Sequence, residues 1–250
     1  MNIRLVAAAV LVLAAPAFAQ KAKSNDEVIA IQKVQQATTP AAQLAAIDYV
    51  LATFADTEYK SVLLSMATDT ANRSHDYAKT IIYGERALQA DPKSFYVRYV
   101  LAGAIVQHTR VNDLDKDTKL KQAETYSNEG IQLIKPAPAP RPDMTPAQWE
   151  AAKKDQTAAF YDILGMCADL KKDYPTAITE FKTAISTATS PDPVTLARLS
   201  KAYDENKQYD ESIATADKVL AMADASAVVK QAAQDEKAKA TKAKAAPPSN

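Results

Sequence analysis

Glycine, histidine and cysteine are scarce in this sequence of 250 residues. Its 4 glycines all lie inside helical patterns rather than in loops: Gly84, Gly103, Gly130 and Gly165. Phosphate-binding loops need several closely spaced glycines, so the sequence excludes P-loop and dinucleotide-binding motifs. The 2 histidines and the single Cys167 supply no nucleophile, general-base or metal-binding set, and we expect no enzyme activity and no cofactor.

Excess charge of either sign is also missing. The chain carries 30 Lys and Arg against 30 Asp and Glu, a formal net charge of +0. A nucleic-acid or anionic-membrane partner would favour a basic excess, so neither is indicated. Alanine-rich and glycine-poor usage, with apolar residues at helical spacing, predicts an all-α protein.

The N-terminus reads as a targeting segment. Arg4 provides a positive start, Leu5–Ala15 an apolar run, and Ala17-Phe18-Ala19 an A-x-A cleavage site. The run is too short for a mature transmembrane helix. Residues 1–19 are therefore predicted to be a signal peptide, with an exported mature protein that is periplasmic or secreted in a bacterium.

One stretch, Tyr161–Ala184, carries the pattern of a helical repeat. The 34-residue pattern W-x2-L-G-x2-Y…A-x3-F is met by Leu164, Gly165, Ala177 and Phe181, while Tyr161 and Ala168 stand at its Trp and Tyr positions. This stretch resembles a tetratricopeptide (TPR) repeat. The resemblance extends over roughly residues 41–223 and implies a TPR-like solenoid of about four helix pairs.

The chain divides by composition around these repeats. A polar leader and short helix precede the repeats, a proline-rich linker separates two groups of repeats, and a capping helix ends in a tail that we expect to be disordered. The predicted segments are 1–19, 20–39, 40–135, 136–145, 146–224 and 225–250.

The resemblance also implies where a partner would bind. In TPR proteins the first helices of successive repeats form a concave wall that holds a peptide or protein partner. From the positions of this chain that match that wall, the predicted partner-binding residues are Asp69, Asn72, Arg73, Tyr96, Tyr99, Gln107, Asp162, Met166, Asp169 and Lys201. The alternative is that these residues are core or solvated helix positions, with Tyr99 packed inside.

A second pattern lies in the long insertion at 107–119. Asp113, Asp115, Asp117 and Glu124 match positions 1, 3, 5 and 12 of an EF-hand calcium loop, although Thr118 occupies the position of the invariant glycine. The alternative is a solvated loop in which Asp115 or Asp117 caps the next helix.

Taken together, these features predict an exported, non-catalytic scaffold or adaptor that binds a peptide or partner protein on its concave surface, in envelope assembly or secretion. The alternative is a periplasmic protein that binds a small molecule or calcium. Trp149, the only tryptophan, either anchors its helix on the fold or docks a partner.

Overall fold

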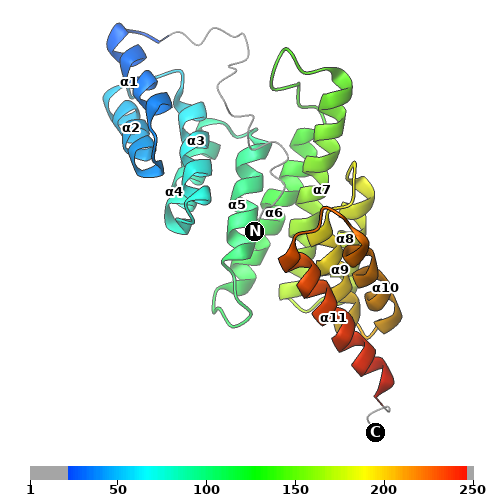
Figure 1. The fold of residues 1–250 in the computed structure, drawn as a ribbon. Helices are drawn as coiled ribbons and strands as arrows, with labels where there is room; N and C mark the ends of the chain where they lie inside the picture. Colours follow the sequence, from blue (N-terminus) through cyan, green and yellow to red (C-terminus); the bar gives the residue numbers. More distant parts are fainter. Residues whose placement is uncertain (1–21, 247–250) are drawn as a thin grey trace. The chain divides into compact units, whose positions relative to one another are not determined.

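The structure, a computed structural model, describes residues 22–246, so the predicted signal segment lies outside the described residues. The described chain is all α-helical, with eleven helices and no strand (Figure 1). The helices are α1 Asn25–Gln36, α2 Pro40–Thr53, α3 Lys60–Arg73, α4 Tyr77–Ala90, α5 Phe95–Gln107, α6 Lys116–Ile134, α7 Pro146–Leu170, α8 Tyr174–Thr187, α9 Pro193–Glu205, α10 Tyr209–Ala221 and α11 Ala227–Ala245. The predicted fold class, a TPR-like solenoid, is confirmed.

Successive helices pack in pairs, and α11 closes the series. Contacts link α1 with α2, α3 with α4, and α9 with α10, and α11 lies against both α9 and α10. The first helices of the repeats are therefore the odd-numbered ones. Helices α1 and α2 likewise contact each other as a pair, and α2 contacts α3.

The chain forms two compact units. Residues 22–109 and 119–149 make up the N-terminal unit, and residues 110–118 and 150–246 make up the C-terminal unit. Each unit has its own buried apolar side chains, because an amphipathic helix must cover its apolar stripe against a neighbour.

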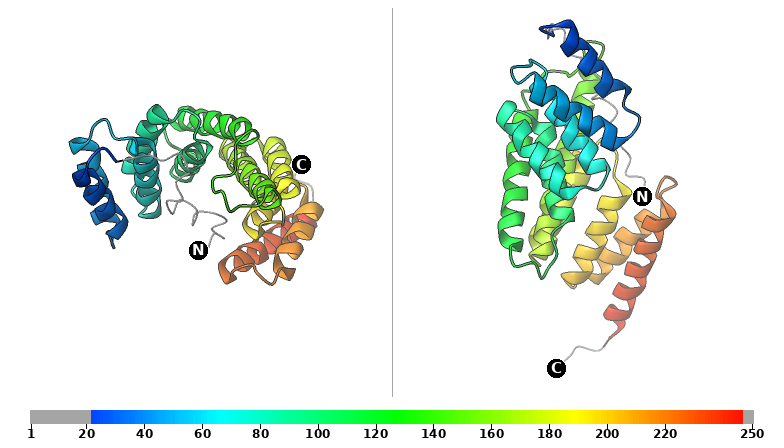
Figure 2. Two further views of the ribbon diagram at one scale, coloured as in Figure 1. Left: turned by 90° about the horizontal axis from the view of Figure 1, so that it is seen from above. Right: turned by 90° about the vertical axis from the view of Figure 1, so that its left-hand side faces the viewer.

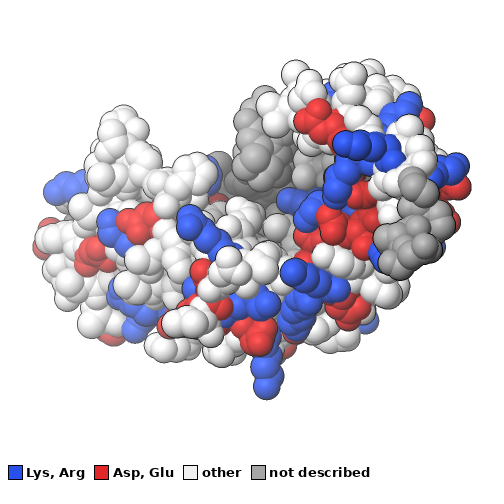
Figure 3. Space-filling model, turned by 90° about the horizontal axis from the view of Figure 1, so that it is seen from below, with Lys and Arg blue, Asp and Glu red and all other residues white. Residues whose placement is uncertain are grey.

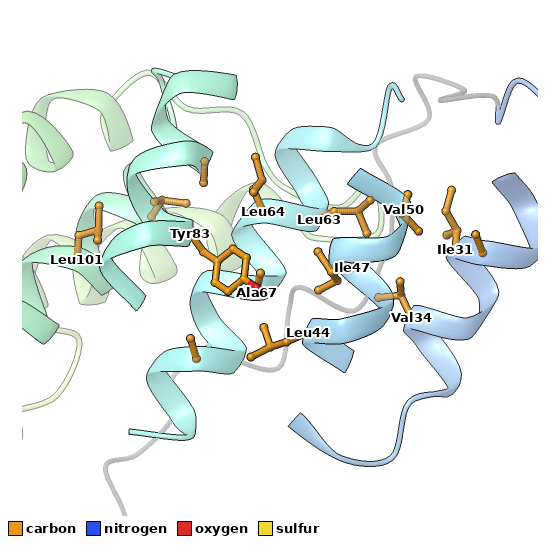
Figure 4. Close-up of a cluster of buried hydrophobic side chains, with 14 residues drawn as sticks. Ile31, Val34, Leu44, Ile47, Val50, Leu63, Leu64, Ala67, Tyr83 and Leu101 are labelled. Carbon is orange, nitrogen blue, oxygen red and sulfur yellow. The ribbon is translucent and has the colours of Figure 1, made fainter. Parts of the chain in front are cut away.

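In the N-terminal unit, helices α1 to α5 share one core (Figure 4). Ile47 and Val50 of α2 are fully buried, as is Leu64 of α3. Tyr83 of α4 and Leu101 of α5 close the cluster on its other side. The first helix pair is thus built into the core.

In the C-terminal unit, Phe181 of α8 is the largest side chain of one core cluster and is 1% exposed. It lies against Gly165 of α7: a β-carbon at Gly165 would stand 2.5 Å from the Phe181 ring. A second cluster joins Leu196 of α9 and Val219 of α10 to Ala233 of α11.

Local sequence sets the helix ends. Polar side chains cap most of the helices by accepting a backbone N–H of the first turn: Ser24, Thr39, Asp76, Ser94, Thr145, Asp173, Asp192 and Ser226. Between the first and second helices of three repeats, the turn residue has a positive φ without being glycine: 58° at His75, 62° at Lys172 and 60° at Lys207. Side chains rarely adopt this left-handed conformation, so these turns store strain.

The C-terminal helix runs further than the sequence predicted. The Lys/Ala-rich stretch was expected to be disordered, yet α11 continues to Ala245. Alanine and lysine are strong helix formers, and Ala240 is buried, so the stretch has both the propensity and a packing face. Within the described residues, every helix is too short or too polar to cross a membrane.

Candidate partner-binding surface

In the N-terminal unit, Asp69 joins two first helices. The Tyr96 hydroxyl of α5 donates to Asp69 Oδ1 at 2.7 Å, and Asp69 Oδ2 lies 2.7 Å from Arg73 Nη2, one turn further along α3. Burial and the Asp69 carboxylate raise the pKa of Tyr96, so its hydroxyl stays a proton donor. The Arg73 side chain is 58% exposed while the Asp69 side chain is 10% exposed. The buried carboxylate therefore positions an accessible guanidinium.

The other predicted residues of this unit lie around that group. Asn72 and Tyr99 are half-buried, and Gln107 is exposed at the end of α5. Tyr99 thus combines the two predicted roles, with part of its ring packed and part at the surface.

A cavity of about 300 Å³ opens beside Arg73. It is lined by Ala37, Thr38, Thr39, Pro40, Gln43, Thr70 and Arg73, none of them acidic. The Thr70 hydroxyl donates to Gln43 Oε1 at 2.6 Å. Because the amide oxygen of Gln43 accepts this bond, its amide N–H groups remain as donors. Arg73, Gln43 and the hydroxyl of Thr38 give the wall hydrogen-bond donors, which suit a carboxylate or another anionic group.

In the C-terminal unit the predicted residues hold neighbouring repeats together. Asp162 of α7 accepts from Thr195 Oγ1 at 3.0 Å and pairs with Arg198, both on α9. Asp169 of α7 lies 2.7 Å from Lys201 Nζ on α9. Met166 packs against the core cluster around Phe181, so it serves the core as well as any surface.

The backbone of the insertion does not favour the calcium alternative. Helix α6 begins at Lys116, so Asp117, the third predicted ligand, already lies in a helix where a calcium loop would still be turning around the ion. The Asp113 carboxylate instead accepts the backbone N–H of Arg110 at 3.0 Å. Among the described residues, no group of three His, Cys, Asp or Glu side chains is placed to hold a metal.

Trp149 anchors the fold. Its indole Nε1 donates to the backbone oxygen of Ala137 at 2.8 Å, and its ring lies 6.3 Å from that of Phe95. With 9% of its surface exposed, it fastens the start of α7 to the proline-rich segment and offers little to a partner.

Thr195, Arg198 and Lys239 are partners that the sequence reasoning missed. Lys239 of α11 contacts Asp204 and Glu205 of α9 at 2.7 and 2.8 Å. The signal was present in the spacing, because the bonded residues lie 32 to 36 positions apart, about one repeat. Acidic residues of one first helix thus meet donors at the equivalent place in the next.

Charges of both signs are interspersed on the face shown in Figure 3, where Lys and Arg lie next to Asp and Glu. This agrees with the zero net charge and with the ion pairs between repeats.

No protein-family model matches the sequence, and no curated protein matches it. Among solved structures, the chain is similar to a thermophilic TPR protein from Thermus thermophilus, with a TM-score of 0.55 and 15% sequence identity over 86% of this chain and 98% of that chain. At this identity the likeness shows the fold alone. The described residues form a helical-repeat protein with a TPR-like fold.

Proposed function

We propose that this protein is an exported, non-catalytic scaffold that binds a peptide or partner protein on the first-helix face of its repeats, in envelope assembly or secretion. The observation that carries the proposal is the positioned Arg73 beside a cavity whose wall presents donors and no carboxylate. Such a site would accept an acidic side chain or a terminal carboxylate of the partner.

The fixed geometry of this surface favours binding. Arg73 is held by Asp69, which Tyr96 holds in turn, so part of the conformational entropy lost on binding has already been lost on folding. The export part of the proposal rests on the N-terminal sequence pattern.

Capture in the native host tests this function. The tagged protein is cross-linked in the cell envelope, and the captured protein is identified and then re-tested with purified components. The variant Arg73→Ala should weaken binding by at least about tenfold, because a buried charge-assisted contact contributes about 1.5–3 kcal/mol.

Arg86→Ala is the matched control. Arg86 is an exposed arginine of α4, a second helix, and its guanidinium lies 5.7 Å from the Tyr83 ring centre. The control should bind as the wild type does. Equal binding by both variants would place the partner on another surface, and the absence of a reproducible partner would refute the scaffold function.

A further inference from the structure

The C-terminal helix α11 is held by a small apolar contact and by several ion pairs. Figures 1 and 2 show α11 lying along α10. Of its 19 residues, Ala233 and Ala240 are the buried ones, and both are small. Ion pairs to α9 and α10 supplement them: Lys237 with Asp217 at 2.7 Å, Lys239 with Asp204 and Glu205 at 2.7 and 2.8 Å, and Lys244 with Asp210. Docking of α11 is therefore sensitive to the protonation of its contacts.

Three carboxyl groups surround one ammonium at the centre of this contact. Asp204 and Glu205 come from α9, while Glu236 and Lys239 come from α11. The Asp204 and Glu236 side chains are 4% and 16% exposed, and Lys239 Nζ stands 3.8 Å from Glu236 Oε1. With every group ionised the cluster would carry two uncompensated negative charges, which is unfavourable in a buried site.

Two oxygen atoms of this cluster lack a donor. Asp204 Oδ1 and Glu236 Oε1 are buried, and among the described residues neither has a hydrogen-bond partner. Both carboxyl groups face the same ammonium: Lys239 Nζ lies 2.7 Å from Asp204 Oδ2 and 3.8 Å from Glu236 Oε1. A proton on Glu236 would give Asp204 a donor and remove one of the negative charges.

We propose that docking of α11 takes up a proton: Glu236 docks as a neutral carboxylic acid that donates to Asp204, and α11 loosens when a rise in pH removes this proton. We call the cluster of Asp204, Glu205, Glu236 and Lys239 the latch. It holds α11 against α9 at low pH and releases it at high pH.

The surrounding charges support this direction. Burial is the largest cause that raises the pKa of Glu236. The positive charge of Lys239 lowers this pKa, and the Asp204 and Glu205 carboxylates raise it further. Asp210 and Asp217 of α10 are paired with Lys244 and Lys237 of α11, and Glu205 also faces Tyr174, which lies near Asp169 and Lys201. Asp210 and Asp217 each have a lysine of their own, whereas Glu236 shares Lys239 with Asp204 and Glu205.

The sign follows from proton linkage. The raised pKa means that docked α11 keeps a proton that undocked α11 releases near the ordinary glutamate pKa of about 4.3. Docking is thus fully favoured below that pH and weakens as the pH rises towards the raised pKa.

Hydrogen exchange on the full chain tests the latch. The opening constant of α11 is measured from its amide exchange between pH 5 and pH 9, after correction for the intrinsic rate. In the wild type it should rise with pH by up to about tenfold per pH unit until Glu236 is ionised. Amides of α3 and α4 in the other unit serve as an internal reference.

Two neighbouring variants separate this latch from a general charge effect. Glu236→Gln keeps a donor for Asp204 and cannot ionise, so its opening constant should not change with pH. Asp235→Asn removes one charge from the adjacent, exposed position and should keep the wild-type slope. A flat wild-type profile, or a Glu236→Gln profile as steep as the wild type, would overturn the proposal.

A third variant keeps the proposal testable if the new amide in Glu236→Gln packs poorly and disturbs α11 by itself. Asp204→Asn keeps an acceptor oxygen and removes the charge that faces Glu236, so the slope should decrease while α11 stays protected at pH 5. An unchanged slope in Asp204→Asn would show that Asp204 is not the acceptor and would likewise overturn the proposal.

Discussion

Substituting Gly165 by alanine should destabilise the C-terminal unit, although alanine is the better helix former. The new β-carbon would lie 2.5 Å from two atoms of the Phe181 ring and 3.0 Å from a third. Carbon atoms in contact prefer about 3.5–4.0 Å, so the ring or helix α7 must move by about 1 Å. Phe181 is 1% exposed and lies in a core cluster with Ile178 and Leu199, so a shift of its ring disturbs these neighbours.

The magnitude is a difference of two terms. Overpacking a core costs about 1–3 kcal/mol, and the change from glycine to alanine within a helix returns about 1 kcal/mol. The net destabilisation is therefore about 0–2 kcal/mol, with the midpoint near 1 kcal/mol, equivalent to a fall in Tm of about 2–4 °C for a chain of this size.

Thermal unfolding followed by circular dichroism measures this effect. The double variant Gly165→Ala with Phe181→Leu should be more stable than the sum of the two single changes predicts, because the smaller side chain makes room for the methyl group. A Gly165→Ala protein that is about 1 kcal/mol more stable than the wild type would refute the close approach of α7 and α8.

Two further predictions concern a strained turn and a buried hydroxyl. Lys172→Gly should stabilise the protein by up to about 1 kcal/mol in denaturant unfolding, because φ at Lys172 is 62°, whereas Lys171→Gly, at a residue without positive φ, should bring no gain. Burial and the Asp48 carboxylate, which accepts from the Tyr83 hydroxyl at 2.7 Å, raise the pKa of Tyr83 to about 12. The free energy of unfolding should therefore decrease as the pH rises from about 10 to 12, and absorbance titration of Tyr83→Phe should lose one late-titrating tyrosine while the early ones remain.

The sequence predicted the repeat at the place where helix packing requires a recognisable motif of particular residues. Gly165 and Phe181 belong to the repeat pattern, and their contact in the structure is the reason that the pattern has a glycine there. The first helix pair was not recognised as a pair, because its apolar residues Ile47 and Val50 have helical spacing without the small-residue motif. Helical periodicity alone gives a helix but not its partner.

The candidate surface was only partly predictable. Matching positions to the repeat family located Asp69, Asp162 and Asp169 on first helices, yet their hydrogen-bond partners lie about one repeat further along the chain. No local pattern shows such a pair. The cavity beside Arg73 was not predicted from the sequence either, because its walls come from two separate segments, residues 37–43 and 70–73.

The hydrogen bonds and ion pairs between first helices determine how local unfolding of one repeat would affect its neighbours. Tyr96 with Asp69, Arg198 with Asp162 and Lys239 with Asp204 each join one repeat to the next, so they add to the free energy of the interfaces and not to that of single repeats. A larger interface term makes neighbouring repeats open together. Damage in α9 would then be transmitted in both directions, to α7 through Asp162 and to α11 through Asp204, and unfolding would proceed in blocks longer than one repeat.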